Sequence, residues 1–265
     1  MLCGRLRGPT LEGARSNRGD ALTRTPRDHP DAPGPGFEAA FALIDDIPGW
    51  LTRAQAARLH HEASLVPPGG TAVEIGSHFG RSAVVTALGL PAGARLVAID
   101  PFGAAWRYGT SETEAGFRAN LARAHVTDRV EVRVQTSREA LRSWDTPVDL
   151  VYVDGKHDAF SLIHDMGWSA HLRPGATILV HDSFSSLGVT LGILFRLLGS
   201  RRLRYTGRDG SLARFEVGRP RVGDRVRMLA QLPWFARNLF IKVLLRLRLT
   251  PLAARLGHHD PADPY

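Results

Sequence analysis

The ten residues Val73–Ser82, which read VEIGSHFGRS, decide how the rest of the chain is interpreted. Residues 71–75 are mostly apolar or β-branched, as in a buried strand, and residues 81–88 favour a helix. Between them, Gly76 and Gly80 allow a sharp turn and the close approach of a ligand. Because backbone N–H groups at the start of a helix attract anions, we expect a negatively charged or zwitterionic ligand at this turn.

Beyond this turn, predicted strands and helices alternate along the chain. Further strands are expected over residues 95–99, 129–134, 148–153, 177–180, 202–206 and 212–217. A helix is expected over residues 159–171, and turns at residues 173–175 and 207–210. This order predicts an α/β, Rossmann-like fold with a mostly parallel seven-stranded sheet, an antiparallel C-terminal hairpin and helices on both faces.

The chain divides into three segments of different composition. Residues 1–36 are rich in Arg, Pro, Gly and Asp, and are expected to be disordered because they cannot bury enough apolar surface. Residues 37–218 are expected to form the folded domain, which starts with capping helices over residues 37–46 and 52–64. Residues 219–265 form a basic C-terminal extension.

Charge and cysteine content indicate the setting in which the protein works. The net charge is +8, and residues 196–265 hold fifteen Lys or Arg against five Asp or Glu. Cys3 is the only cysteine, which excludes an intrachain disulfide and fits a reducing compartment. The sequence has neither a secretory signal nor about 18 consecutive uncharged apolar residues, so we expect a cytoplasmic protein without a membrane span.

Acidic and histidine residues follow the predicted strands at the points where the strands end. Asp100 follows the second strand, Asp154 and His157 follow the fourth, and His181 and Asp182 follow the fifth. Because the carboxyl ends of parallel strands meet at one edge of a sheet, we expect these side chains to surround one ligand. An acid in the position of Asp100 can accept hydrogen bonds from both hydroxyls of a ribose.

These residue types also predict a reaction. Asp154, Asp182 and His181 can bind a divalent cation such as Mg²⁺. His157 can act as a general base, because a neutral imidazole accepts a proton from a hydroxyl that the cation has made more acidic. The alternative is that the two aspartates only cap the helices that follow their strands. Asp165, on the predicted helix after His157, is expected to be a solvated charge.

Five motifs, in their order along the chain, resemble those of class I S-adenosylmethionine (SAM)-dependent methyltransferases. The most similar subgroup contains the macrocin O-methyltransferase and cephalosporin-biosynthesis enzymes. The motifs are VEIGSxxGRS, IDPF, YVDGxH, LRPG and VHDS, and the resemblance covers about residues 48–217. It implies methylation of a hydroxyl on a small molecule or a glycoside, with SAM as the methyl donor.

The resemblance also implies a role for each site residue. The methionine part of SAM would be lined by Glu74, Gly76, Ser77 and Gly80. Asp100 would hold the ribose, Thr136 and Ser137 would flank the adenine, and Asp154 would border the cofactor. A metal site would consist of Asp154, His181 and Asp182, with His157 as the base. Relatives often carry an acid where this chain has Thr136, and metal-binding members often carry an acid where it has His181.

Two other functions fit parts of the sequence. A nucleotide-dependent oxidoreductase can use the same fold, although the glycine spacing E-x-G-x-x-x-G differs from the G-x-G-x-x-G of dinucleotide sites. A non-catalytic, membrane-associated binding module is disfavoured by the intact Asp154, His157 and Asp182. The loop around Trp106 and Tyr108 is expected to form an aromatic wall for the acceptor.

The C-terminal extension predicts a basic amphipathic helix. Its apolar stripe contains Leu239, Phe240, Val243, Leu244 and Leu247, and cations beside it include Arg237, Lys242, Arg246 and Arg248. Such a helix can rest on an anionic membrane, pack on the core, or pair with a second copy to form a homodimer. Nucleic-acid binding is disfavoured, because the cations alternate with leucine more than with exposed aromatic residues.

Overall fold

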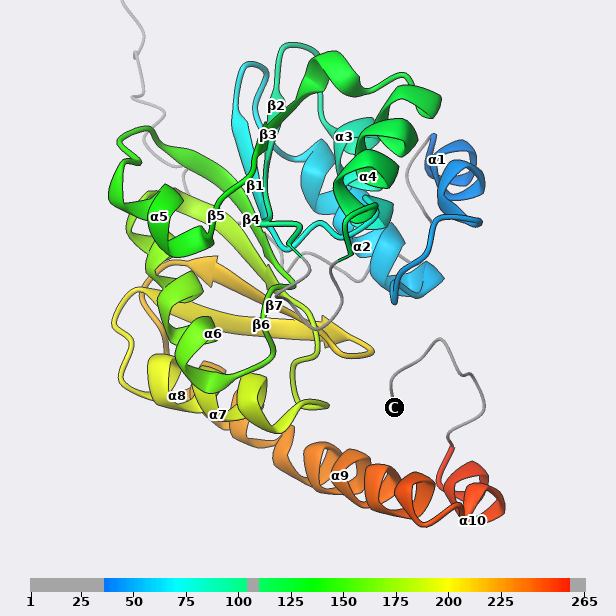
Figure 1. Ribbon diagram of the computed structural model, residues 1–265. Coiled ribbons are helices and arrows are strands. Elements are labelled where there is room, and N and C mark those ends of the chain that lie inside the picture. Colours follow the sequence, from blue (N-terminus) through cyan, green and yellow to red (C-terminus); the bar gives the residue numbers. More distant parts are fainter. Residues whose placement is uncertain (1–35, 104–109, 258–265) are drawn as a thin grey trace, which may run out of the picture. The chain divides into compact units, whose positions relative to one another are not determined.

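A seven-stranded sheet is the centre of the fold. The computed structural model describes residues 36–103 and 110–257. The strands are β1 (Thr71–Ile75), β2 (Arg95–Ile99), β3 (Val130–Arg133), β4 (Val148–Val153), β5 (Leu172–Val180), β6 (Leu203–Asp209) and β7 (Leu212–Val217). Their order is β3-β2-β1-β4-β5-β7-β6, and only the β7 and β6 pairings are antiparallel (Figure 1). This arrangement confirms the predicted fold class.

Helices cover both faces of the sheet. In chain order they are α1 (Phe37–Ile44), α2 (Arg53–Ser64), α3 (Arg81–Gly89), α4 (Thr113–Arg123), α5 (Ser137–Arg142), α6 (Ala159–Asp165), α7 (Leu187–Leu198), α8 (Val222–Leu229), α9 (Leu232–Arg246) and α10 (Thr250–Arg255). Helices α1 to α4 lie on one side of the sheet, and α5 to α7 lie on the other (Figure 1). Two 3-10 turns, Thr127–Arg129 and Met166–Ala170, complete the regular structure.

Alternating side chains in the central strands build two apolar clusters. In β1, Ala72 packs into the cluster with α1 to α4, whereas Val73 and Ile75 pack into the cluster on the opposite face. Every residue of β1 is buried. Successive residues of a strand point to opposite faces, so a strand covered on both sides must be apolar almost throughout. The pattern of residues 71–75 therefore requires helices above and below β1.

Three local predictions are wrong in detail. Residues 173–175 belong to β5 rather than to a turn, because the pairing shifts between Val148 and Leu150 and thereby accommodates the extra residues. The hairpin turn is only Gly210 and Ser211, since Asp209 pairs with Leu212 and Gly207 lies at an irregularity inside β6. The predicted helix over residues 159–171 is divided into α6 and the 3-10 turn Met166–Ala170.

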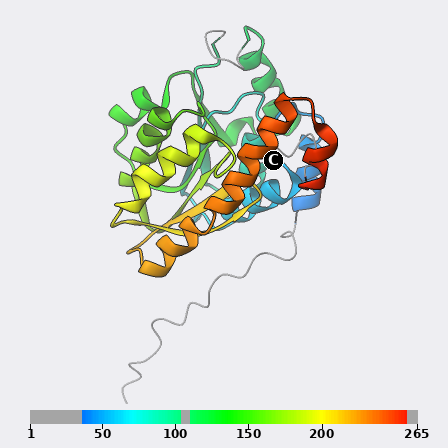
Figure 2. The same ribbon diagram turned by 90° about the horizontal axis from the view of Figure 1, so that it is seen from below.

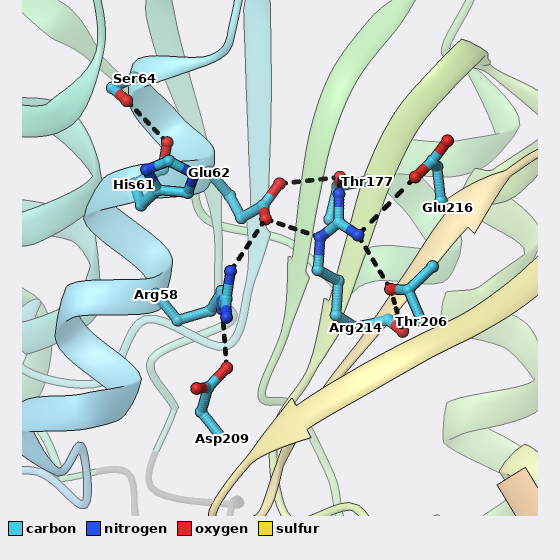
Figure 3. Close-up of polar contacts among 9 residues, drawn as sticks. All are labelled: Arg58, His61, Glu62, Ser64, Thr177, Thr206, Asp209, Arg214 and Glu216. Atoms are coloured by element: carbon cyan, nitrogen blue, oxygen red, sulfur yellow. Dashed lines mark hydrogen bonds and ion pairs between the residues drawn. The ribbon is translucent and has the colours of Figure 1, made fainter. Parts of the chain in front are cut away.

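A buried polar network joins α2 to the C-terminal strands. Arg214 Nε donates to Glu62 Oε1 at 2.6 Å, and Thr177 Oγ1 donates to Glu62 Oε2 at 2.9 Å. Arg58 Nε donates to Asp209 Oδ2 at 2.7 Å. Figure 3 shows the Glu62 carboxylate between the two arginines. The network fastens an N-terminal helix to strands formed about 150 residues later, and thereby fixes the position of α2 beside the sheet.

The C-terminal extension is helical throughout its described part. Helix α10 packs against α9 through Ala253, Ile241 and Leu244. Within residues 36–103 and 110–257, no helix is long and apolar enough to cross a membrane. Cys3, the N-terminal arm up to residue 35, and the aromatic pair Trp106 and Tyr108 lie outside the described residues.

Candidate functional site

The turn after β1 requires glycine at two positions. Gly76 has a φ of 84°, and a Cβ atom there would lie 2.2 Å from the carbonyl oxygen of Asp154. Gly80 has a φ of 90°, and a Cβ atom there would lie 2.9 Å from the Phe117 ring. Both conformations are rarely adopted by other residues. The missing side chains allow the β1 turn to contact the end of β4 at Gly76 and the Phe117 ring of α4 at Gly80.

Asp100 at the end of β2 organises this turn. Its Oδ2 accepts hydrogen bonds from the backbone N–H groups of Ser77 at 2.7 Å and His78 at 3.0 Å. Its Oδ1 accepts a hydrogen bond from Phe102 N–H at 2.7 Å. Two N–H groups that the turn was expected to offer to an anion are therefore already engaged. Oδ2 uses both of its lone pairs in these bonds, whereas Oδ1 keeps one, so Asp100 remains able to accept a hydrogen bond from a hydroxyl.

Glu74 places a buried acid directly before the glycine turn. Its side chain is fully buried, and neither carboxyl oxygen has a hydrogen-bond partner in the described part of the chain. Burial raises the pKa of Glu74 to about 8, with Asp154 and Asp100 contributing and the nearby Ser77 and Ser82 hydroxyls opposing the shift. A buried acid without a partner is unfavourable. A cationic group of a ligand would supply the missing partner.

The residues predicted to flank an adenine have structural partners of their own. Thr136 caps α5, because its Oγ1 accepts a hydrogen bond from Glu139 N–H at 3.2 Å. Ser137 Oγ accepts a hydrogen bond from Trp168 Nε1 at 2.9 Å. Both residues lie beyond β3, at the same edge of the sheet as Gly76 and Asp100. Their position suits the predicted role, and their side chains are held in place by these bonds.

Asp165 lies at the same edge of the sheet, buried near Gly155, where the sequence favoured a solvated charge. The expected solvated charge is wrong, since Asp165 is only 7% exposed. Burial raises its pKa to about 6, against the effect of the Ser137 hydroxyl, and its Oδ2 lies near Gly155. The available signal was its spacing, because Asp165 follows Leu162 by three residues and shares the buried face of α6.

Histidine and aspartate side chains from the ends of β4 and β5 form a connected cluster. His157 lies between two carboxylates, with Nε2 3.3 Å from Asp154 Oδ1 and Nδ1 3.3 Å from Asp182 Oδ2. His181 Nδ1 lies 3.2 Å from Asp154 Oδ1. Tyr152 donates to Asp154 Oδ2 at 3.1 Å. The structure therefore brings together all four residues that were expected at these strand ends.

This cluster favours charged imidazoles. Burial lowers the pKa of both histidines, but the neighbouring Asp154 and Asp182 outweigh it, so the pKa of His157 is raised and that of His181 reaches about 9. Burial alone would raise the pKa of Asp154, yet His181 and His157 hold that pKa well below its usual range. At neutral pH, His181 is an imidazolium that compensates the buried carboxylates.

The predicted Mg²⁺ site does not fit this arrangement. Within the described ranges, no group of three or more His, Cys, Asp or Glu side chains is arranged to hold a metal ion. His181 Nδ1 lies 3.2 Å from Asp154 Oδ1 and 3.7 Å from Asp182 Oδ1, so these side chains contact one another directly. The set of Asp154, His181 and Asp182 is therefore occupied by its own ion pairs.

The aspartates of this cluster do not cap the following helices. The residue that caps α6 is Asp158, which accepts a hydrogen bond from Ser161 N–H, and α7 begins after Ser186. The capping alternative for Asp154 and Asp182 is thus wrong. Asp182 has a φ of 55°, and His78, Phe102 and Phe184 at the same edge also have positive φ values. Such strained residues often gather where a fold binds ligands.

Comparison with known proteins shows what this region is similar to. Residues 73–183 match a protein-family model described as a methyltransferase domain. The matched segment starts in β1 and ends just beyond Asp182, so it contains nearly the whole cluster of strand ends. This segment of the chain is therefore similar to a methyltransferase domain.

Solved structures of methyltransferases share the fold. An O-methyltransferase from Bacillus cereus in complex with SAH is 20% identical, with a TM-score of 0.51, covering 69% of this chain and 90% of that one. The O-methyltransferase TomG from Streptomyces achromogenes, involved in tomaymycin synthesis and in complex with SAM, is 21% identical, with a TM-score of 0.50 and coverage of 69% and 88%. The SAH-bound methyltransferase PaMTH1 of Podospora anserina is 15% identical, with a TM-score of 0.54 and coverage of 70% and 88%. At these identities the likeness concerns the fold.

Proposed function

We propose that this methyltransferase domain transfers a methyl group from SAM to a hydroxyl oxygen of a small molecule or a glycoside. The observation that carries the proposal is the buried, unpartnered carboxyl of Glu74 beside the glycine turn. The ammonium group of the methionine part of SAM would be a cationic hydrogen-bond partner for the Glu74 carboxyl group. A role in NAD binding is disfavoured, because the glycine spacing differs from that of dinucleotide sites.

The residues that would hold SAM come from three strand ends. Glu74 would accept hydrogen bonds from the ammonium group, with Gly76, Ser77 and Gly80 alongside. Asp100 would accept a hydrogen bond from a ribose hydroxyl with the lone pair of Oδ1 that the turn leaves available. Thr136 and Ser137 would flank the adenine, and the buried Asp165 beside Ser137 joins this group as an acceptor for the exocyclic amine. When bound, SAM supplies a methyl group attached to a positively charged sulfur.

His157 is the residue that we assign as general base. Its side chain is about one-third exposed, at 35%, so an acceptor can reach it, whereas His181 is almost completely buried. Asp154 and Asp182 orient the ring from both sides. The base form is the neutral imidazole, which takes the proton from the acceptor hydroxyl as the oxygen attacks the methyl group. Orientation of the two reactants supplies much of the remaining acceleration.

Two observations support an oxygen acceptor. The motif order resembles the macrocin and cephalosporin subgroup, and two similar folds belong to enzymes named O-methyltransferases. Both facts favour an oxygen acceptor on a small molecule. The single cysteine, Cys3, supports a reducing, cytoplasmic setting for the reaction.

A cofactor-binding assay and a transfer assay test the proposal. Calorimetry should show binding of S-adenosylhomocysteine and no binding of NADH. Radiolabelled SAM, incubated with a panel of phenols, alcohols and glycosides, should label an acceptor with the native protein and not with His157→Ala. His164→Ala, an exposed histidine on α6, is the matched control and should retain activity. Binding of NADH without S-adenosylhomocysteine would overturn the proposal.

A further inference from the structure

The outer face of α9 is apolar although it is exposed. Leu239, Phe240, Val243 and Leu247 are between 39% and 63% exposed and follow one another at helical spacing. The opposite face of the same helix buries Asn238, Ile241 and Leu244. Most of the predicted apolar stripe therefore points away from the core, and Leu244 is its buried exception. A soluble helix normally exposes polar residues on this face.

Helix α9 is fastened to the fold and presents this face in a fixed orientation. Asn238 is fully buried, and its Nδ2 donates to the carbonyl oxygen of Phe184 at 3.1 Å. Arg237 Nε donates to the carbonyl oxygen of Leu256 at 2.8 Å, which holds α10 against α9. Both helices lie along the lower edge in Figure 1 and cross the near side in Figure 2, which is seen from below.

The surroundings of this face are strongly basic. The sequence from Arg225 to Gly257 contains seven Lys or Arg and no Asp or Glu. Arg246 at the end of α9, Arg248 in the following turn and Arg255 in α10 are exposed, and the first two flank Leu247 in the sequence. An exposed apolar stripe within a segment that contains cations and no acids is complementary to a surface that is both apolar and negatively charged.

Charge decides between the partners that such a face can have. In a symmetric pair of chains the same patch would face itself, so the cations would meet cations with no acid to pair with them. Nucleic acid would match the charge, but it needs exposed aromatic rings for stacking, and only Phe240 in the stripe is aromatic. An anionic lipid surface matches both the charge and the aliphatic stripe.

We propose that α9 and α10 dock on the surface of an anionic lipid bilayer. The outer stripe of α9, defined as Leu239, Phe240, Val243 and Leu247, enters the boundary between headgroups and acyl chains. The three exposed arginines contact the lipid headgroups. With fifteen residues, α9 is shorter than the roughly 20 residues needed to cross a bilayer, so it lies in the plane of the surface.

Vesicle flotation of the full-length protein tests this docking. The protein should float with vesicles of phosphatidylcholine mixed with phosphatidylglycerol, should stay behind with pure phosphatidylcholine, and should lose binding as sodium chloride rises. Phe240→Ser/Val243→Ser/Leu247→Ser should abolish flotation. Arg246→Gln/Arg248→Gln/Arg255→Gln should weaken the partition coefficient on the order of a hundredfold, because each cation near an anionic surface contributes separately.

A matched control separates the α9 patch from the charge of the whole protein. Arg95→Gln/Arg118→Gln/Arg142→Gln removes the same charge from other exposed positions and should float like the native protein. Circular dichroism checks that every variant is folded. Equal flotation of the native protein with both vesicle types, or of the two arginine variants with anionic vesicles, would overturn the proposal. So would a dimer in solution that the serine variant dissociates, if no vesicle binding accompanies it.

Discussion

His157 Nδ1 lies 3.3 Å from Asp182 Oδ2, so a histidine that follows β4 contacts a carboxylate that follows β5. These strands are neighbours in the sheet, and the contact joins residues 25 positions apart. Asp182 adds to the effect of Asp154, and together they overcome the burial that would otherwise lower the pKa of His157. The proposed base is therefore protonated over a wider pH range than an ordinary histidine.

This contact predicts the pH dependence of the reaction. Because the base form of His157 is neutral, kcat/KM should rise with pH through the raised pKa of His157, above the usual 6.5. Asp182→Asn removes one negative neighbour and should move this acidic limb to lower pH. His157→Ala should lower kcat by on the order of 100-fold to 10,000-fold. An unmoved limb in Asp182→Asn would contradict the assignment, and His164→Ala serves as the control.

Glu74 predicts proton release when the cofactor binds. With a pKa of about 8, Glu74 is protonated at neutral pH, and an ammonium partner favours its carboxylate. Binding of S-adenosylhomocysteine should release a proton below pH 8, and affinity should rise with pH and level off above 8. Calorimetry in buffers of different ionisation enthalpy measures this release. Glu74→Gln should abolish it, whereas Glu114→Gln on the surface of α4 should not.

The same shift predicts a pH effect on the unliganded protein. The pKa of Glu74 is higher in the folded than in the unfolded chain, so its contribution to stability is greatest below about 4.5 and is lost as pH rises towards 8. The Tm of Glu74→Gln minus the Tm of the native protein should therefore be larger in alkaline than in acidic buffer. A Tm difference that is independent of pH would show that Glu74 is not proton-linked to folding.

The network between α2 and β7 predicts a large loss of stability. Glu62→Ala removes the 2.6 Å partner of the buried Arg214 and leaves Glu216, at 3.7 Å, as its carboxylate partner, which should lower the free energy of unfolding by about 3 kcal/mol in urea titrations. Glu38→Ala, which breaks the exposed pair with Arg53, should cost less than about 1 kcal/mol. Similar losses in both variants would contradict the role given to the buried network.

Substitution of two glycines, one in the turn after β1 and one after α7, should change stability by different amounts. Gly76→Ala should destabilise the fold by about 2 kcal/mol or more, because its Cβ would meet the backbone of Asp154 and its φ is 84°. Gly199→Ala should change stability by less than about 0.5 kcal/mol, since its φ is −89° and nothing lies within 4 Å of the added carbon. Thermal unfolding of both variants checks this contrast.

Treatment with EDTA tests whether methyl transfer needs a metal ion at Asp154, His181 and Asp182. Because His181 compensates the carboxylates of Asp154 and Asp182, exhaustive EDTA treatment should leave methyl transfer intact. Activity that disappears with EDTA and returns with Mg²⁺ would show that the cluster rearranges around a cation. The measurement should use native protein with the acceptor found in the transfer assay.

The strands and the site edge could be predicted because their signals are local. Residues 71–75 carry an apolar run that only a strand buried on both faces tolerates, and Gly76, Asp100, Asp154 and Asp182 follow strands at points that a parallel sheet brings together. The three-residue spacing from Leu162 places Asp165 on the same face of α6, but only the packing of α6 on the sheet showed that this face is buried. The structure alone likewise showed the bulges that lengthened β5 and β6.

The sequence by itself determined the alternation of strands and helices, the glycine turn and the identity of the chemical groups at the strand ends, because these depend on residue type and spacing. Only the tertiary structure decided their ionisation and partners. Asp154 and Asp182 lie beside two histidines, Glu74 has no hydrogen-bond partner among the described residues, and the apolar stripe of α9 faces outwards. Charge states and exposure depend on neighbours that are distant in sequence, which no local pattern specifies.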